Sequence, residues 1–495
     1  MLFNSKEFIL IFFPLVLLGY YLLPKIFKNF SNVYWLLAAS IIFYSYWNYK
    51  FILLLLLSAS VNYSIGSSLK KNKKNNLLIL GILFNLFILG YFKYRNFFVE
   101  NINFLFSQDL SLANLILPLG ISFFTFQQIA YLVDMKNQTN ISKDNFLKFF
   151  LFLSFFPQLI AGPIVKHRNI LPQLNSKSIL KLNYRNISIG LSIFCIGLFK
   201  KTFIADNLGL ISDPIFYASE NLVSISFFEA WVGTIAYSFQ IYFDFSAYSE
   251  MAIGLALLFN IKLPFNFTSP YKSKNISIFW RNWHITLSSF LRDYFFFPIK
   301  YYLVQLSYSK KNLLVNTDLF SNYFPIILTF LMIGIWHGAG WNFVIFGLLH
   351  GLGIIIVEIL NKTQISFNKS FKYLSYILTF LFVSLCWVLF RSETIAGALN
   401  LYYSLFGLNF FEHESFFPNK LIPTSGKITS LILIGTSIVC FLTPNIKEIF
   451  FSNKNMSLKI FSWSPNLYWM IYCASLFVVG FLYIDKTIKF LYFAF

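Results

Sequence analysis

Three of the five histidines in this 495-residue chain lie in strongly apolar, aromatic stretches, where a titratable side chain is costly and marks a candidate reactive site. His337 and His350 belong to 330–353, FLMIGIWHGAGWNFVIFGLLHGLG, and His284 belongs to 275–299, NISIFWRNWHITLSSFLRDYFFFPI. Gly-Ala-Gly directly follows His337, and such a run is a poor helix interior that lets backbones approach closely. We therefore predict that His337 lies at a helix break and is the reactive centre.

The chemistry that suits such a histidine is general base catalysis. A neutral imidazole is the side chain best able to take a proton from an alcohol near neutral pH, and desolvation would keep His337 in that form. If the electrophile is a thioester, its developing oxyanion needs donors. The available donors are Trp336, Asn342, Arg281 and His284. The sequence has no G-x-S-x-G motif and no cysteine beside a histidine, so we expect direct transfer without a covalent intermediate.

Other interpretations of the histidines remain open. His337 is alternatively a packed, hydrogen-bonded core histidine, although its position at the glycine break argues against this. A metal or haem site would be expected to bring carboxylate or thiolate co-ligands at helical spacing, and none accompany these histidines. We expect no metal and no bound cofactor. His167 and His413 have charged neighbours on both sides, which predicts solvated loops.

The stretch around His284 allows two interpretations. Trp280, Trp283, His284 and Leu287 recur at three- and four-residue spacing, which predicts one face of a continuous helix. That helix would either lie along the membrane interface, anchored by aromatic and arginine side chains, or re-enter the membrane. In the second case His284 and Arg281 would lie beside the reaction cavity.

Asp244 and His350 are two further tentative substrate contacts. Asp244 and Tyr248 lie four residues apart in the apolar stretch 242–250, YFDFSAYSE, and so share a helical face. A carboxylate inside a membrane span is paired or faces a cavity, so Asp244 is either tied to Tyr248 or an arginine, or touches substrate. His350 follows His337 by thirteen residues, which on an unbroken helix would place the two on different faces, so they need not act on the same atom.

Composition predicts that membrane helices position these residues. The chain is 57% hydrophobic and 12% charged, whereas soluble proteins carry about 25% charged residues. Its apolar runs of about 17 to 25 residues are long enough to cross a bilayer as helices. We predict an all-α polytopic membrane protein with about eleven crossings in a single domain, 1–495. The candidate spans, some of which we expect to be broken or re-entrant, are 7–24, 31–49, 51–69, 77–94, 115–134, 146–165, 186–205, 228–259, 323–336, 341–361, 373–391, 428–446 and 467–485.

Two segments of these spans are expected to be irregular. Pro118 and Gly120 stand near the start of 115–134, and two prolines flank Ala161-Gly162 in 155–164. Non-helical backbone at membrane depth is tolerated only where it is buried in protein or lines a cavity.

The net charge of +20 indicates a membrane surface rather than nucleic acid as the partner. Basic residues gather in short connections, at 70–74, 166–168, 200–201 and 310–311, as expected for loops that face the cytoplasm beside anionic lipid. The four cysteines stand alone in apolar runs and are expected to pack as small hydrophobic residues. The apolar run 8–23 has no small-residue cleavage site, which predicts a retained first membrane helix.

Two segments carry a family resemblance. The sequences 280–299, WRNWHITLSSFLRDYFFFPI, and 333–351, IGIWHGAGWNFVIFGLLHG, resemble the signature regions of the membrane-bound O-acyltransferases. Within that family they resemble the bacterial branch that O-acetylates alginate and peptidoglycan. The start of the chain, 117–134, 155–164 and 242–254 also match. The signature core covers 115–360, and the resemblance of 361–495 is looser.

The resemblance implies a ring of membrane helices around a central tunnel, with His337 as the catalytic histidine and His284 at the supporting position. It implies transfer of an acyl group from a cytosolic thioester, with acetyl-CoA as the expected donor, toward an extracytoplasmic polysaccharide across the bacterial inner membrane. A separate periplasmic acetyltransferase or esterase-like protein is the expected partner. The chain departs from the pattern at Asn282, where arginine is usual, and after Pro298, where Ile299 to Tyr301 replace Leu-Gly-Gly. These departures leave the acceptor and the partner open.

A transporter of a polysaccharide precursor is the rival function from another class, with polar intramembrane residues lining its path. A transporter of this kind would be expected to have two halves of corresponding sequence pattern, and the chain does not show them. A catalytically idle membrane scaffold is a third alternative, in which replacing His337 would leave surface acetylation unchanged.

Overall fold

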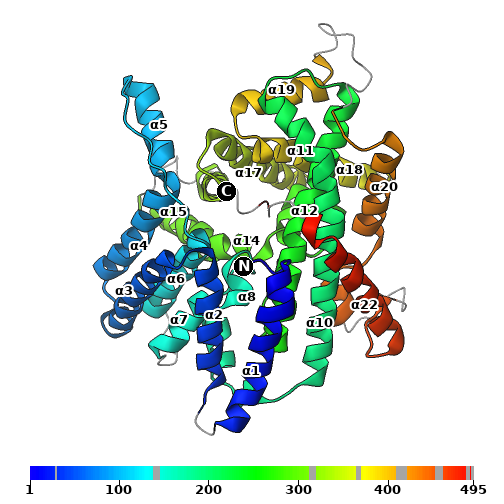
Figure 1. Ribbon diagram of the computed structural model, residues 1–495. Helices are drawn as coiled ribbons and strands as arrows, with labels where there is room; N and C mark the ends of the chain where they lie inside the picture. The colour runs from blue at the N-terminus through cyan, green and yellow to red at the C-terminus, as the bar shows by residue number, and fades with distance from the viewer. Residues whose placement is uncertain are drawn as a thin grey trace. The chain divides into compact units, whose positions relative to one another are not determined.

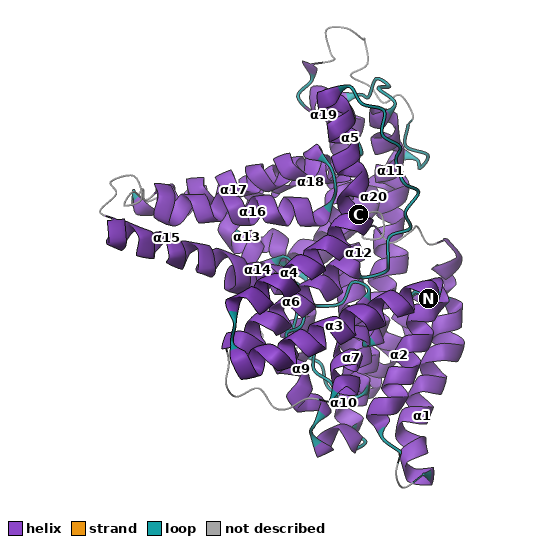
Figure 2. Cartoon of the chain, turned by 90° about the vertical axis from the view of Figure 1, so that its left-hand side faces the viewer, coloured by secondary structure: helices purple, strands orange, loops and turns teal. Residues whose placement is uncertain are grey.

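The structure is a computed structural model that describes residues 1–27, 30–137, 145–310, 319–363, 369–408, 421–451, 461–486 and 491. Within these residues every regular element is a helix (Figure 2). Nine helical segments of the described chain are long and apolar enough to cross a membrane, which makes the protein an all-α, multi-pass membrane protein. They are Phe8–Ile26, Lys50–Asn72, Asn75–Phe106, Tyr184–Glu220, Phe227–Leu258, Leu319–His337, Trp341–Lys362, Tyr373–Arg391 and Gly426–Phe451.

The described chain divides into two compact units, and each unit combines segments from distant parts of the sequence. The first unit holds Met1–Leu198, Tyr248–Phe265 and Pro465–Leu476, and the second holds Phe199–Ala247, Asn266–Ser464 and Phe477–Phe495. The long helix α12 (Phe227–Leu258, green in Figure 1) carries the chain from the second unit into the first. The single domain expected from the sequence stays a prediction.

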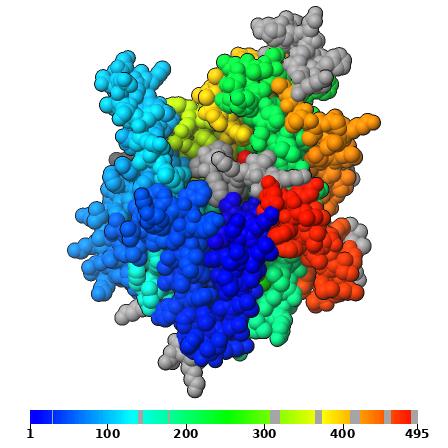
Figure 3. All heavy atoms as spheres, in the orientation of Figure 1, coloured from blue at the N-terminus to red at the C-terminus, as the bar shows by residue number. Residues whose placement is uncertain are grey.

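The first unit consists mainly of the helices that precede residue 199. They are η1 (Phe8–Phe12), α1 (Phe13–Ile26), α2 (Asn32–Asn48), α3 (Lys50–Asn72), α4 (Asn75–Leu89), η2 (Gly90–Tyr94), α5 (Arg95–Phe106), α6 (Ile121–Asn137), α7 (Phe146–Ser154), α8 (Phe156–Leu159), α9 (His167–Leu174), η3 (Lys177–Leu180) and α10 (Tyr184–Phe199). Helices α1 and α2 lie side by side at the surface (blue in Figure 3). The indole N–H of Trp35 joins them by donating to the carbonyl of Val16 at 2.8 Å.

The irregular start of the predicted span 115–134 is confirmed, since α6 begins only at Ile121. Gly120 has φ +69°, and a Cβ atom there would lie 2.5 Å from the carbonyl oxygen of Leu159, so this turn requires glycine. The freed carbonyl of Leu119 accepts a hydrogen bond from the hydroxyl of Tyr44 at 3.2 Å. The two irregular segments therefore pack against each other at Gly120 and Leu159. The non-helical backbone carbonyl of Leu119 has its hydrogen-bond partner inside the protein, as membrane depth requires.

The irregular segment predicted at 155–164 is also confirmed, because the candidate span 146–165 consists of α7, α8 and a non-helical turn. The break falls at Phe155, two residues before Pro157. A continuous helix would leave the carbonyl of Leu153 without its partner, since proline has no N–H to donate. The N–H that follows the break donates instead to the hydroxyl of Ser40 at 3.2 Å.

The sequence analysis placed His167 in a solvated loop, and this prediction is wrong. This residue is 1% exposed, and its ring packs edge-on against Tyr131 and Phe152, with ring centroids 4.9 and 5.4 Å away. His167 is the first residue of α9, where adjacent residues point in different directions, so its charged neighbours do not keep it in solvent. His413 lies outside the described residues.

The second unit contains the remaining helices. They are η4 (Lys200–Ala205), α11 (Asp206–Glu220), most of α12, η5 (Pro270–Lys272), α13 (Ile276–Asn282), α14 (Ile285–Leu291), η6 (Arg292–Phe296), α15 (Phe297–Lys310), η7 (Leu319–Tyr323), α16 (Phe324–His337), α17 (Trp341–Lys362), α18 (Lys369–Arg391), α19 (Ile395–Leu405), α20 (Gly426–Leu442), α21 (Ile446–Phe451), the end of α22 (Leu467–Leu482) and η10 (Ile484–Lys486). Helices α16 and α17 run side by side as a hairpin (Figure 2), and this hairpin carries two of the apolar histidines.

Candidate active site

The helix break predicted at His337 is confirmed. Helix α16 ends at this residue, Gly338 and Gly340 are extended, and α17 begins at Trp341. A Cβ atom at Gly338 would overlap the ring of Phe343, which explains why the link needs a residue without a side chain. His337 thus stands at the tip of a tight hairpin and is 3% exposed.

Two further glycines bring the backbones of α16 and α17 into contact. A Cβ atom on Gly334 would overlap the carbonyl of Phe343, and one on Gly347 would overlap the carbonyl of Phe330. The obstructing atoms are backbone atoms, which cannot swing aside as a flexible side chain can. This crossing fixes where the side chains of the hairpin meet.

The hairpin brings His337 and His350 to the same aromatic ring. The ring of Phe346 lies 6.1 Å from that of His337 and 4.5 Å from that of His350, between centroids. His337 also packs on Phe390 of α18 at 5.0 Å. The Nδ1 atom of His350 accepts a hydrogen bond from the indole N–H of Trp280 at 3.2 Å, so His350 is tied to α13.

The continuous helix expected around His284 is wrong. Helix α13 ends at Asn282, Trp283 is extended, and α14 starts at Ile285. His284 itself has φ +39° and ψ +53°, a left-handed conformation that is uncommon outside glycine and costs on the order of 1–3 kcal/mol. The helical face that the aromatic spacing predicts is therefore interrupted at this break. His284 is nevertheless completely buried, as the re-entrant interpretation expects and an interfacial helix does not.

Asn266 supports this break, and the sequence analysis did not single it out. Its backbone carbonyl accepts from the N–H of Ile285 at 2.9 Å, and its side-chain oxygen accepts from the hydroxyl of Thr286 at 2.5 Å. Asn266 therefore accepts a hydrogen bond from the backbone N–H of Ile285, which in a continuous helix would bond to a carbonyl one turn earlier. Nothing in the local pattern of residues around 266 marks this role, because the partners lie about twenty residues apart in the chain.

The imidazole of His284 lies between two aromatic rings. Phe245 of α12 packs on it at 4.8 Å and Trp336 of α16 at 5.9 Å, between ring centroids. The same indole lies 4.9 Å from the ring of His337, so the two histidines flank Trp336. Neither ring nitrogen of His284 has a hydrogen-bond partner among the residues that the structure describes. A buried polar group in this state is suited to meet a ligand.

The side chain of Asn342, one of the predicted oxyanion donors, forms hydrogen bonds within the protein. Its amide nitrogen donates to the carbonyl of Leu389 at 3.2 Å and to that of Ser392. These bonds join the start of α17 to the end of α18. The amide N–H groups of Asn342 are thus already engaged by the protein.

Asp244 forms an ion pair inside the second unit. Its Oδ1 lies 2.6 Å from Nζ of Lys201, which also contacts Asp206 at 2.7 Å, and its Oδ2 accepts from the backbone N–H of Leu491 at 3.0 Å. The partner is thus a lysine rather than the predicted tyrosine or arginine. Lys201 is 2% exposed, so its expected position in a basic cytoplasmic connection is wrong. The π-helical segment η4 explains its direction, because a π turn aligns residues five apart and so brings Lys201 to Asp206.

Removing one member of this pair is expected to destabilise the protein. Lys201→Gln leaves the two buried carboxylates of Asp206 and Asp244 without their shared cation, a change that costs about 3–5 kcal/mol. The expected result is a lower temperature of half-aggregation in detergent. Asp213→Asn is the control, because its pair with Arg391 at 3.2 Å is partly exposed and is worth about 1 kcal/mol or less. Equal effects of the two substitutions would contradict a structural role for the Asp244 pair.

A cavity of about 630 Å³ lies next to the histidine cluster in the second unit. It is lined by Ser277, Trp280, Arg281, Ile285, Ser288, Ser289, Arg292, Phe296, Ile326, Thr329, Phe330, Ile333 and Ile354. Two of these residues adjoin the cluster directly: Trp280 donates to His350, and Ile285 follows His284 in the chain. Arg281 and Arg292 bring positive charge to the lining, and Nε of Arg292 donates to Oδ1 of Asp293 at 3.0 Å. Among the described residues no three His, Cys, Asp or Glu side chains group as metal ligands.

Comparison with known proteins identifies the class to which this site belongs. Residues 41–395 match the membrane-bound O-acyltransferase family, and the chain belongs to that family. The protein is therefore an acyltransferase, and the resemblance carried by 280–299 and 333–351 is confirmed.

Several relatives resemble the chain over most of its length. A peptidoglycan O-acetyltransferase of Helicobacter pylori is 43% identical over 440 residues, which cover 83% of this chain and 80% of that protein. A probable alginate O-acetylase AlgI of Azotobacter vinelandii is 35% identical over 450 residues, covering 89% and 85%. A teichoic acid D-alanyltransferase of Bacillus subtilis is 29% identical over 265 residues, covering 53% and 63%.

Proposed function

We propose that this protein is an O-acetyltransferase of the bacterial inner membrane that moves an acetyl group from a cytosolic thioester toward hydroxyl groups of a cell-surface glycan. The observation that carries the proposal is the buried pair His284 and His337 on one shared indole, each at a helix break, in a chain of this family. The names of the two relatives that are similar over most of the chain support acetyl transfer to peptidoglycan or alginate, and the higher identity favours peptidoglycan.

In the proposed reaction His337 acts as the general base. Its imidazole takes the proton of an acceptor hydroxyl while that oxygen attacks the thioester carbonyl. The new C–O bond forms, the C–S bond breaks, and the thiolate leaves with the proton that the imidazolium returns. The imidazole of His284, which makes no hydrogen bond within the described residues, and the neighbouring indole of Trp336 would donate to the developing oxyanion. A periplasmic acetyltransferase or esterase-like partner would supply the accepting hydroxyl or pass the group on to the glycan.

The cavity beside the histidines suits an anionic donor such as acetyl-CoA. Guanidinium groups bind phosphate by paired hydrogen bonds, and Arg281 and Arg292 offer two of them at one cavity wall. The apolar residues of α16 on the cavity lining would exclude water from the thioester. No ion pair of Arg281 within the described chain competes for this role.

Neutralising either arginine is expected to weaken binding of the charged donor. Arg281→Gln or Arg292→Gln should raise the KM for acetyl-CoA about tenfold or more, the effect of one charge-assisted hydrogen bond. The KM for the uncharged thioester S-acetyl-N-acetylcysteamine should stay unchanged, because that donor has no phosphate. Arg185→Gln, at an exposed residue outside the cavity, is the matched control. Equal changes in KM for both donors would contradict a phosphate-binding role.

The direct test of the function uses the full chain in lipid nanodiscs with radiolabelled acetyl-CoA and glycan fragments as acceptors. We expect labelled ester to form and His337→Ala to abolish it. Flux of a lipid-linked glycan that does not depend on the acetyl donor would instead favour the transporter.

A further inference from the structure

A second hollow in the second unit also lies against α17 and shares no lining residue with the donor cavity. This groove has a volume of about 670 Å³, within the range of about 300–1,000 Å³ typical of ligand sites. It runs between α17, α18 and the residues that lead into α13. Its lining is Lys274, Asn275, Ile276, Gly353, Ile356, Val357, Leu360, Asn361, Ser375, Leu378, Thr379 and Phe382.

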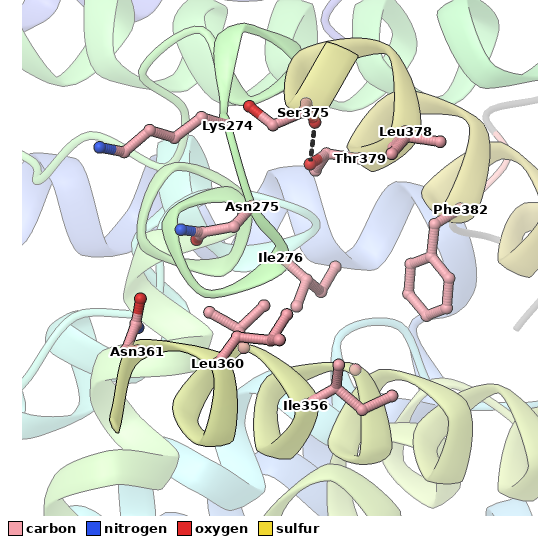
Figure 4. A pocket seen from close by; sticks show the side chains of 12 residues that line it. Lys274, Asn275, Ile276, Ile356, Leu360, Asn361, Ser375, Leu378, Thr379 and Phe382 are labelled. Carbon is pink, nitrogen blue, oxygen red and sulfur yellow. Dashed lines mark hydrogen bonds between the residues drawn. The ribbon is translucent and has the colours of Figure 1, made fainter. Parts of the chain in front are cut away.

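The groove is amphipathic along its length. Figure 4 shows Lys274, Asn275 and Asn361 gathered toward one end, whereas Leu378 and Phe382 lie toward the other. A wholly apolar surface would be expected if the groove only faced the hydrocarbon of the bilayer. A cation with two amides beside an apolar channel instead suits a ligand that has a charged head and a hydrocarbon tail.

The polar end of the groove lies where two membrane spans end. Asn361 is the last residue but one of α17, and Ser375 is near the start of α18. The apolar end lies deeper, at Gly353, eight residues earlier on α17, or about 12 Å along the helix. If α17 crosses the bilayer, as its length and composition allow, the groove leads from the membrane interface into the hydrocarbon layer. Its apolar side chains Ile356 and Leu378 are 57% and 55% exposed.

We propose that this groove binds one anionic phospholipid of the surrounding bilayer. Lys274 holds the phosphate, Asn275 and Asn361 donate to its oxygens, and one acyl chain lies along the apolar end. Basic pockets between transmembrane helices recognise anionic headgroups in this way, and a lysine near the surface contributes a favourable interaction with anionic lipid. The bilayer supplies such a ligand at high local concentration, which a soluble metabolite does not match.

The position of the deep end links this lipid to the histidine cluster without making it a substrate. The ring of Phe382 lies 5.7 Å from that of His350, and a Cβ atom on Gly353 would lie 3.2 Å from Phe382. The acyl chain would therefore complete the packing behind His350. The lipid fills a gap that the side chains alone leave open.

Native mass spectrometry of the full chain in detergent tests this proposal with added phosphatidylglycerol and phosphatidylethanolamine. We expect one bound phosphatidylglycerol, held about fivefold more tightly than phosphatidylethanolamine, whose ammonium group offsets its phosphate charge; this is the size expected for one lysine beside a lipid of net negative charge. Lys274→Ala should remove this preference. Lys362→Ala is the matched control, because Lys362 also lies at the end of α17 but contacts Tyr323 at 5.3 Å and does not line the groove.

A second pair of variants tests the tail site. Thr379→Trp should fill the groove and weaken both lipids at least tenfold, whereas Ile377→Trp on the same helix should not, because Ile377 lies outside the lining. Equal effects of the two lysine variants would show that general surface charge accounts for binding and would overturn the proposal. Displacement of phosphatidylglycerol by acetyl-CoA would assign the groove to the acyl donor and overturn it as well. Lys274→Ala keeps the test decisive if the tryptophan variant does not fold.

Discussion

His337→Ala is expected to lower acetyl transfer by about 10²–10⁴-fold, the contribution of a general base. His284→Ala should lower turnover less severely, because only His337 is assigned proton removal. The structure gives both residues comparable burial, 3% and 0% exposed, so a difference between them would arise from chemistry rather than from exposure. The measurement is kcat with acetyl-CoA and a glycan fragment, for the full chain in nanodiscs.

His337→Gln is the companion variant, since glutamine keeps a polar side chain of similar reach but cannot accept a proton near neutral pH. It should be as inactive as His337→Ala while keeping the thermal stability of the unsubstituted protein. Equal loss at His284 and His337, or activity that survives at His337, would contradict the assignment. In the idle-scaffold alternative, neither histidine variant would change acetylation.

The break at His337 was predictable because its cause is visible in the residue types. Because Gly338 and Gly340 have no side chain, the ring of Phe343 can pack against the link between α16 and α17. Gly120 is likewise a visible cause of a break, because its positive φ forms the turn that directly precedes α6. Where a break depends on glycine or proline, a local pattern is enough to find it.

The break at His284 was not predictable for the converse reason. No glycine or proline lies within 276–291, and the helical spacing of the aromatic residues continues across the gap. The break depends on Asn266, which lies in a different segment and caps the start of α14. Tertiary hydrogen bonds here override the local pattern, and the strained conformation of His284 coincides with the candidate site.

Charge patterns misled in two places. The adjacent Lys200 and Lys201 predicted a loop that faces the cytoplasm. Lys201 is instead buried and forms ion pairs with Asp206 and Asp244. His167 lies between two basic residues and is buried among aromatic rings. Neighbours in the chain do not share a helical face, so the sign of adjacent charges says little about where one side chain points.

Gly347→Ala is expected to disable the site although it adds only a methyl group. That group would overlap the carbonyl of Phe330 on the facing helix, so α16 and α17 must separate. Overpacking of this kind costs about 1–3 kcal/mol. Separating the helices also shifts His337 relative to Phe346 of α17. A displacement of about 1 Å at a reacting group lowers turnover about 100-fold. We therefore expect a lower melting temperature together with a kcat reduced by about two orders of magnitude.

Gly435→Ala is the control that distinguishes backbone contact from the general effect of alanine in a helix. Gly435 lies inside α20, and no atom lies within 4 Å of the position its Cβ would take. Alanine there should leave kcat unchanged and stabilise the helix by up to about 1 kcal/mol. A Gly347→Ala protein with normal kcat would mean that α16 and α17 are not held at backbone contact. The hairpin would then not be what positions His337, and the proposed base would have to be held by α18 through Phe390 instead.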